Sequence, residues 1–292
     1  MNAESIRLGA LAPLAAAFLA CSGSTGSTAG GPPPPVICHD WPTAATVGIP
    51  ADTPALTPMA EESYHTDHDG QVFDHVELLG RLYVDHKNVI VRRSRLVGDV
   101  YYAIYSADDA TGLIVEDSDI QGGVLFGDGF IGRRNHLHAR PGGDKDDGWI
   151  FAASRVLLED NLIDGLVGGP GAHLDGIQAM AGQDITIRNN WIEAISPPIP
   201  DDDQGRPGGV NAAVFFKPDF GEISDVTVDC NMLIEEEGYY PLRIDARGAV
   251  VVRHNRWRRG FVGTSPVDIR DGTMVTTWED NAYEDGEVIP AR

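Results

Sequence analysis

The stretch "DITIRNNWIEAI", residues 184–195, decides the fold that this sequence predicts. Apolar residues alternate with polar ones up to Asn190, and a second short alternation follows it. A period of two is the period of a β-strand, in which successive side chains point to opposite faces. The stretch therefore predicts two short strands joined by a polar bend at Asn190.

The same pattern occurs again along most of the chain. The further copies are "NVIVRRSRLVGD" (88–99), "GLIVEDSDIQGG" (112–123), "GFIGRRNHLHAR" (129–140), "RVLLEDNLIDGL" (155–166), "DVTVDCNMLIEE" (225–236), "AVVVRHNRWRRG" (249–260) and "MVTTWEDNAYED" (274–285). The bend falls at Ser94, Ser118, Asn135, Asn161, Asn190, Asn231, Asn255 and Asn281, at spacings of 17 to 41 residues. Strand-period repeats of this length predict an all-β solenoid, a parallel β-helix of about eight coils.

Asparagine suits the bend for two reasons. It tolerates left-handed backbone better than most residues. Stacked Asn side chains can also hydrogen-bond from one coil to the next. We therefore expect left-handed backbone at these positions and a ladder of Asn side chains along the coils.

Another short strand is expected between each bend and the next repeat. Alternation predicts one row facing the core, made of Trp149, Ile177, Val214, Leu242 and Val267. It predicts an outward row of Ile150, Gln178, Phe215, Arg243 and Asp268, and a second outward row of Ala152, Met180, Lys217, Asp245 and Arg270. Because stacked strands lie about 4.8 Å apart, Lys217, Asp245 and Arg270 are expected to form one charged line, either an ion-pair ladder or part of a groove.

Length and charge limit the possible classes of protein. The chain has 292 residues, which is enough for one large domain, and its formal net charge is −22. Nucleic-acid binders carry a basic face, so we expect no nucleic-acid partner. A polyanionic substrate would need local Lys, Arg or a cation to screen the contact.

The N-terminus has the pattern of a targeting segment. Arg7 precedes the apolar run "LGALAPLAAAFLA" (8–20), which is long enough for a signal peptide and short for a membrane span. Cys21 and the tether "SGSTGSTAGGPPPP" (22–35) follow, and together they resemble a bacterial lipoprotein signal with Cys21 as the lipidated residue. An ordinary signal peptide is the alternative. The expected divisions are 1–21 signal, 22–57 tether and cap over the first coil, and 58–292 β-helix domain, and the expected location is the cell envelope, lipid-anchored or secreted.

Two further cysteines remain in the chain. Cys38 and Cys230 are able to form a disulfide in an oxidising compartment, or to stand as one tail thiol and one buried thiol. Their spacing leaves both alternatives open.

The repeats, with "DGIQ" at 175–178 and "DFG" at 219–221, resemble the pectin lyase-like superfamily from about Val72 to the C-terminus. The resemblance implies a right-handed β-helix and a role on polysaccharides. It leaves the chemistry open, because function depends on sites rather than on folds. Elements of the polygalacturonase-type hydrolases, Asn-Thr-Asp, Gln-Asp-Asp and Gly-His-Gly, are absent as such from the sequence.

Two turns mark the expected site. Asp147 and Asp175 stand at equivalent places, each followed by Gly, so they should be neighbours on adjacent coils. The alternative is that Asp-Gly here is ordinary turn chemistry.

His136 and His138 alternate about Leu137 and should face one way, but the sequence indicates no clear carboxylate or Cys partner for a metal.

A lyase needs a base beside a uronate carboxylate and a cation to neutralise that carboxylate. We therefore predict a polysaccharide lyase acting on a uronate-containing polymer, with a β-helix glycoside hydrolase or a non-catalytic carbohydrate-binding or surface protein as alternatives. The predicted catalytic residues are Asp147, His173, Asp175, Lys217 and Arg243. The predicted substrate-binding residues are Gln178, Phe215, Tyr240, Asp245 and Arg270. Asp146, Asp147 and Asp175 are the predicted Ca²⁺ ligands, and we expect a monomer with no other cofactor.

Overall fold

Strands dominate the described part of the molecule. The computed structural model describes residues 38, 40–59, 63–139, 148–168, 170–196, 198–201, 203–205, 208–236 and 238–291, all within the unit Ile37–Arg292. These residues contain no helix, and hence none that could cross a membrane. Cys21 and the remainder of the predicted signal lie outside the described residues.

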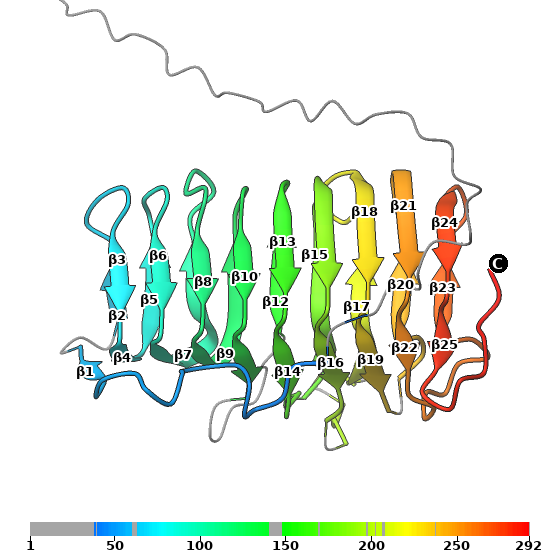
Figure 1. Ribbon diagram of the computed structural model, residues 1–292, viewed down its shortest axis with the longest axis horizontal. Coiled ribbons are helices and arrows are strands. Elements are labelled where there is room, and N and C mark those ends of the chain that lie inside the picture. Colours follow the sequence, from blue (N-terminus) through cyan, green and yellow to red (C-terminus); the bar gives the residue numbers. More distant parts are fainter. Residues whose placement is uncertain are drawn as a thin grey trace, which may run out of the picture. The chain divides into compact units, whose positions relative to one another are not determined.

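The strands of the described residues join into one 25-stranded sheet through parallel pairings. Figure 1 shows strands from successive repeats side by side in chain order. Their pairings define three stacks, which the chain visits in turn. The all-β part of the predicted fold is thereby confirmed.

Stack 1 contains β2 (Ser63–His65), β5 (Arg81–Val84), the end of β7 (Arg95–Ser106), the end of β9 (Asp119–Phe126), β12 (Trp149–Ala152), the start of β15 (His173–Arg188), β17 (Gly209–Phe216), β20 (Leu242–Ile244) and β23 (Val267–Ile269). Stack 2 contains β3 (Val72–Asp74), β6 (Ile90–Arg92), β8 (Ile114–Glu116), β10 (Ile131–Arg133), β13 (Val156–Glu159), the end of β15, β18 (Ile223–Asp229), β21 (Arg247–Arg253) and β24 (Val275–Glu279). Stack 3 contains β1 (Thr57–Pro58), β4 (Val76–Leu79), the starts of β7 and β9, β11 (His136–His138), β14 (Leu162–Asp164), β16 (Trp191–Ala194), β19 (Met232–Glu235), β22 (Arg256–Trp257) and β25 (Ala282–Tyr283).

The core is formed by the inward side chains of these stacks. In stack 1, Trp149, Ile177, Val214 and Leu242 lie in register on neighbouring strands and are fully buried. Val267 continues the row on β23. The predicted inward row is therefore confirmed, and its partner row faces outward.

The Asn ladder is also confirmed. Asn135, Asn161, Asn190, Asn231, Asn255 and Asn281 are buried, and each one's Oδ1 accepts a hydrogen bond from the backbone N–H of the preceding anchor, at 2.9 to 3.1 Å. Their side-chain amides also donate to carbonyls of the preceding repeat, as Asn190 does to Leu158 at 3.0 Å. The side chains thus satisfy buried backbone groups at the bend, where the strand ladder is interrupted.

The expected backbone at the bend needs a correction. The left-handed residue is the one before each anchor, for example Asp160 (φ 55°), Asn189 (φ 50°) and His254 (φ 55°). The anchor itself directs its side chain inward to the ladder. The residue before it makes the corner, and Arg, Asp, Asn, Cys or His fills that place.

Ion pairs between successive repeats lie at the ends of the stack 2 strands and at the bends. A basic residue of one repeat pairs there with an acidic residue of the neighbouring repeat. The pairs are Arg92–Asp74 (2.9 Å), Arg133–Glu116 (2.6 Å), Arg134–Asp117 (2.7 Å), Arg188–Glu159 (2.5 Å) and Arg253–Asp229 (2.9 Å). Opposite charges on facing positions favour this register of neighbouring strands.

We expected the N-terminal segment to cap the first repeat; its described residues also contact later repeats. Trp41 Nε1 donates to the Cys230 carbonyl at 3.0 Å, and the N–H of Gly48 donates to the Arg134 carbonyl at 2.9 Å. Only at β1 does the segment reach the first repeats, by pairing with β4. It therefore runs alongside the bends of several repeats before it reaches the first one (Figure 1).

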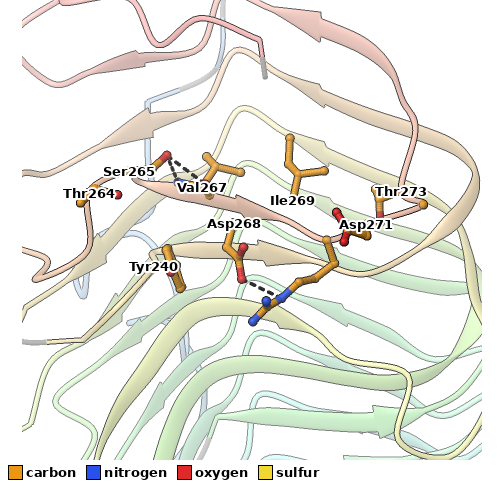
Figure 2. Close-up of a pocket in the computed structure, with 10 residues that line it drawn as sticks. Tyr240, Thr264, Ser265, Val267, Asp268, Ile269, Asp271 and Thr273 are labelled. Carbon is orange, nitrogen blue, oxygen red and sulfur yellow. Dashed lines mark hydrogen bonds and ion pairs between the residues drawn. The ribbon is translucent and has the colours of Figure 1, made fainter.

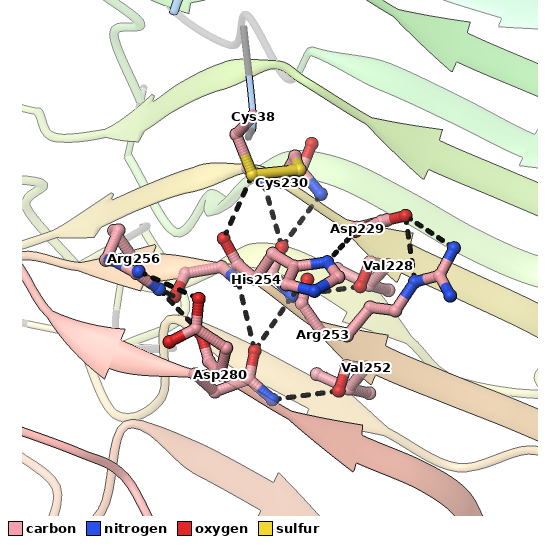
Figure 3. A network of polar contacts seen from close by, with 12 residues as sticks. Cys38, Val228, Asp229, Cys230, Val252, Arg253, His254, Arg256 and Asp280 are labelled. Carbon is pink, nitrogen blue, oxygen red and sulfur yellow. Dashed lines mark hydrogen bonds and ion pairs between the residues drawn. A yellow bond between two sulfur atoms is a disulfide. The ribbon is translucent and has the colours of Figure 1, made fainter. Parts of the chain in front are cut away.

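A disulfide fixes this segment. Cys38 is bonded to Cys230, with a Cα–Cα distance of 5.5 Å, so the structure resolves the two alternatives that the sequence left open. Figure 3 shows the bond beside His254, whose Nδ1 lies 2.9 Å from Asp229 Oδ1. Asp229, Cys230 and His254 have metal-ligand spacing. The Cys230 sulfur is in the disulfide and Asp229 also pairs with Arg253, so these groups are already engaged in structural contacts.

Candidate functional site

The candidate site lies on the outward face of stack 1. Its "outer row" consists of Leu125, Ile150, Gln178, Phe215, Arg243 and Asp268, which pair in register from β9 to β23. The row predicted from the sequence, Ile150 to Asp268, has this order. At about 4.8 Å per strand, the outer row is a straight line of about 24 Å.

The expectation that Phe215 binds substrate needs a correction. It faces outward, as predicted, yet it is only 7% exposed. The guanidinium of Arg243 lies over its ring, 4.9 Å from the ring centre, a cation–π geometry. Phe215 therefore supports Arg243, and its ring is covered where a sugar would have to stack.

Charged groups gather at the C-terminal end of the outer row. Asp268 lies between two guanidinium groups, 2.9 Å from Arg270 Nε and 3.7 Å from Arg243 Nε. The Arg243 side chain is about one-fifth exposed and that of Arg270 nearly half. A single carboxylate thus holds two cations at the surface of a strongly acidic protein.

A pocket of about 380 Å³ opens beside these charges. Tyr240, Ser265, Asp268, Arg270 and Thr273 contribute to its lining. Figure 2 shows Asp268 facing the same space as Tyr240 and Asp271. An adjoining pocket is lined by Asp245 together with Asp268 and Arg270. The predicted substrate-binding residues Tyr240, Asp245 and Arg270 therefore come together here.

The predicted charged line does not form as expected. The backbone N–H groups of Lys217, Asp245 and Arg270 donate to Ala179, Phe216 and Ile244, so the residues do hold equivalent places. Their side chains pair elsewhere: Lys217 with Asp219 (3.0 Å), Asp245 with Arg247 (3.5 Å) and Arg270 with Asp268 (2.9 Å). Each of these side chains pairs with an oppositely charged residue two positions away in the sequence, and not with its neighbour in the predicted line.

His173 and Asp175 lie at the start of β15 and meet through a residue that we did not predict. Asn211 Oδ1 is 3.4 Å from His173 Nδ1, and Asn211 Nδ2 is 3.5 Å from Asp175 Oδ2. His173 is exposed, whereas Asp175 is 1% exposed. A register shift between Leu174 and Asp175 places Asn211 at this point, and sequence alternation gives no signal of such a bulge.

The predicted catalytic residues therefore do not form one cluster. His173 precedes Gln178 by five residues, about 16 Å along the strand. Lys217 lies near the outer row, two residues past Phe215, since its N–H donates to Ala179. Arg243 lies in the outer row. The distance of His173 from the outer row thus excludes one centre formed by His173, Lys217 and Arg243 together, whereas Lys217 and Arg243 lie near each other.

Of the three predicted calcium ligands, Asp175 is the one that the structure describes. Asp146 and Asp147 lie outside the described residues. Asp175 Oδ2 faces the amide of Asn211, a hydrogen-bond donor. The Gly148 N–H donates to the Asp175 carbonyl, so Gly148 and Asp175 lie next to each other on neighbouring strands.

His136 and His138 face one way, as predicted, with ring centres 4.4 Å apart. Carboxylate partners that the sequence did not indicate are present. His136 Nε2 lies 2.8 Å from Asp164 and His138 Nε2 lies 3.0 Å from Asp119. The hydrogen bond to Asp119 raises the pKa of His138, and although burial acts to raise the pKa of Asp119, the bond to His138 helps to lower it.

Glu235, at the end of β19, is the most unusual titratable group of the described residues. It is fully buried, and neither side-chain oxygen has a hydrogen-bond partner within the part of the chain that the structure describes. Burial raises the pKa of Glu235 to about 8. A Cβ at position 238 would lie 1.4 Å from Glu235 Oε1, so Gly238 leaves the space for this carboxyl. Three consecutive Glu residues at 235–237 indicate an exposed, charged segment, so the sequence does not indicate that Glu235 is buried.

Comparison with known protein families, curated proteins and solved structures finds no match to this chain.

Proposed function

We propose that the chain forms a right-handed parallel β-helix of about eight coils, of the pectin lyase-like type. Parallel pairing between successive repeats and the Asn ladder support a coiled path. Parallel strands joined by a crossover are right-handed in about 98% of cases. The tether and the lipid anchor at Cys21 remain part of this proposal, as does a cell-envelope location.

We infer that the protein binds a polysaccharide along the outer row. The observation that carries this inference is the unbroken register from Leu125 to Asp268. Four of its six side chains are partly exposed, and only Ile150 and Phe215 are buried. A straight row that repeats every strand matches a linear polymer better than a compact ligand. The pocket at its end, with Tyr240 and Arg270, offers an aromatic ring and a cation to one sugar unit.

The cations at this end favour a uronate. The protein's charge of −22 repels a polyanion, so binding depends on local cations. Arg243 and Arg270, held by Asp268, are placed to face a carboxylate at the end of the outer row. Arginine binds carboxylates through charge-assisted, often bidentate hydrogen bonds.

Processing by β-elimination is the chemistry that we propose for this site. A base removes the proton from the carbon beside the uronate carboxylate, and a carbon–carbon double bond forms. The glycosidic carbon–oxygen bond breaks, and the leaving oxygen takes up a proton. Arg243 and Arg270 neutralise the carboxylate, and Lys217, two residues beyond Phe215 on the adjoining strand, is the proposed base.

A cleavage assay tests this function. We expect polygalacturonate, alginate or glucuronan to yield new reducing ends together with the ultraviolet absorbance of the unsaturated product. Lys217→Met should reduce the rate by about 10²-fold or more, as expected for loss of a general base. Lys87→Met, the same change at an exposed lysine far along the chain, is the matched control and should keep the wild-type rate.

Other outcomes assign the function differently. New reducing ends without the unsaturated product indicate a glycoside hydrolase. Binding without any product across the panel indicates a carbohydrate-binding surface protein. A wild-type rate in Lys217→Met contradicts the assignment of the base.

A further inference from the structure

The outward face of stack 1 continues beyond the outer row, toward the N-terminal repeats. His65, Tyr83 and Tyr105 pair in register on β2, β5 and β7, and Tyr105 pairs in turn with Leu125. We call these three residues the aromatic end. It lies on the same face as the outer row, and at about 4.8 Å per strand Tyr105 is about 24 Å from Arg243.

The aromatic end is exposed, whereas the opposite face of the same strands is the core. Tyr105 is 38% exposed and the His65 side chain 65%. On the inward side, Leu82 and Ile104 are buried. These rings therefore do not serve to fill the core, which is the usual role of aromatic residues in a strand.

The rings lie next to one another on this face; Tyr83 is covered by His65 and by Arg81, whose Cζ lies 5.4 Å from the Tyr83 ring centre, so Tyr105 offers the exposed ring. His65 and Tyr83 stack face to face, with ring centres 4.4 Å apart and planes 6° apart. The Tyr83 and Tyr105 rings are 6.0 Å apart, and Tyr102 lies 6.2 Å from Tyr105. Tyrosine offers rigid contact area at low entropic cost, and the C–H faces of pyranose rings pack well on such area.

Polar groups hold the rings and line their edges. Arg81 Nη1 donates to the Tyr83 hydroxyl at 3.1 Å, and Arg81 Nε donates to the Tyr102 carbonyl at 3.3 Å. Asp85 Oδ2 lies 2.7 Å from His65 Nδ1. These contacts fix the orientation of the rings before any ligand arrives, which reduces the entropy lost on binding.

The charged residues around the aromatic end favour an uncharged ligand over a uronate. Asp85 is exposed and contacts His65, and Asp67 and Asp69 are exposed in the turn that follows β2. These carboxylates offset the charge of Arg81, so a uronate gains little attraction here, while the hydroxyl groups of an uncharged sugar find acceptors in Asp85. The surface chemistry therefore matches neutral pyranose rings.

We propose that His65, Tyr83 and Tyr105 form a subsite for neutral sugar units, separate from the uronate-binding pocket. The inference rests on the proposed function in one respect, that the ligand is a polysaccharide lying along stack 1. It adds that the ligand is a heteropolysaccharide, with neutral units on the aromatic end and uronate units beside Arg243 and Arg270.

Calorimetric titration with tetrasaccharides tests the two ends separately. The neutral probes are cellotetraose, mannotetraose and xylotetraose, and the charged probe is tetragalacturonate. We expect Tyr105→Ala to weaken binding of a neutral probe about tenfold, since loss of stacking and contact area costs about 1.4 kcal/mol. Tyr105→Phe keeps the ring and should keep the affinity, and neither variant should alter binding of tetragalacturonate.

Arg270→Gln provides the reverse case, with weaker tetragalacturonate binding and unchanged neutral binding. If no neutral probe binds, or if Tyr105→Ala binds it as the wild type does, the neutral subsite is wrong, and the uronate site stands when tetragalacturonate binds and Arg270→Gln weakens that binding. If neutral probes bind through Tyr105 and tetragalacturonate does not bind, the neutral subsite stands and the uronate preference fails. Thermal unfolding of Tyr105→Ala, with the wild-type midpoint as reference, separates loss of binding from loss of folding, and His65→Ala provides a second variant if Tyr105→Ala does not fold.

Discussion

Replacing Glu235 with glutamine is expected to stabilise the protein at pH 8 and to leave its stability unchanged near pH 4. Burial raises the pKa of Glu235 from 4.5 to about 8, so the folded protein keeps this carboxyl neutral while the unfolded chain ionises it. Stability is therefore full below pH 4.5 and falls as the pH rises toward about 8. The difference in pKa corresponds to about 5 kcal/mol across that window.

Urea unfolding at half-unit steps from pH 4 to pH 8 measures the effect. The free energy of unfolding of Glu235→Gln, minus that of the wild type, should grow with pH up to several kcal/mol. Glu236→Gln is the matched control, because Glu236 is adjacent and exposed, and its difference should stay flat. Equal pH dependence in Glu235→Gln and the wild type would falsify the assignment of a buried neutral carboxyl.

Replacing Asn190 with alanine is expected to destabilise the protein by about 3 to 5 kcal/mol, because several buried groups lose their partners at once. Asn190 Oδ1 accepts from the Asn161 N–H (2.9 Å) and from Asn161 Nδ2 (3.0 Å). Asn190 Nδ2 donates to the Leu158 carbonyl, the Arg188 carbonyl and Asn231 Oδ1. Ala leaves these donors and acceptors buried without replacements.

Asn211→Ala is the matched control for this variant. Asn211 is partly buried, and its two side-chain contacts are long, 3.4 and 3.5 Å, so its loss should cost less than about 1 kcal/mol. Urea unfolding followed by circular dichroism compares the two variants. Equal free energies of unfolding for Asn190→Ala and Asn211→Ala would contradict a structural role for the Asn ladder.

Much of the fold is predictable because it depends on local alternation. "DITIRNNWIEAI" predicts strands on either side of Asn190, and the structure has β15 ending at Arg188 and β16 starting at Trp191. The inward position of Ile177 and the outward position of Gln178 follow from the same period of two. The ladder follows from the recurrence of Asn at one position of the repeat.

The rest depends on contacts that alternation does not encode. The left-handed corner falls on the residue before each Asn, since the Asn side chain must point inward to reach the next coil. The bulge at Leu174 that brings Asn211 to His173 and Asp175 has no local signature. The burial of Glu235 depends on Gly238, a feature of packing rather than of pattern.

The candidate site was predictable only in part. Tyr240, Asp245 and Arg270 come together around two adjoining pockets, as an outward row allows. His173 was grouped with Lys217 and Arg243 on chemistry alone, and the strand places His173 about 16 Å from Gln178 in the outer row. Phe215 was predicted to bind substrate, whereas Arg243 covers its ring, and sequence alternation predicts only that both residues face outward.

Hydroxyl-radical footprinting with polygalacturonate and with alginate tests the central claim, that a polysaccharide lies along the outer row. We expect lower oxidation of Leu125, Met180 and Tyr240, which lie on or beside that face and are not buried. Trp278 on β24 and Tyr283 on β25 belong to the other stacks and should be oxidised as in the free protein. Unchanged oxidation of Leu125, Met180 and Tyr240 with both polymers, or protection centred on Trp278 and Tyr283, would contradict the account.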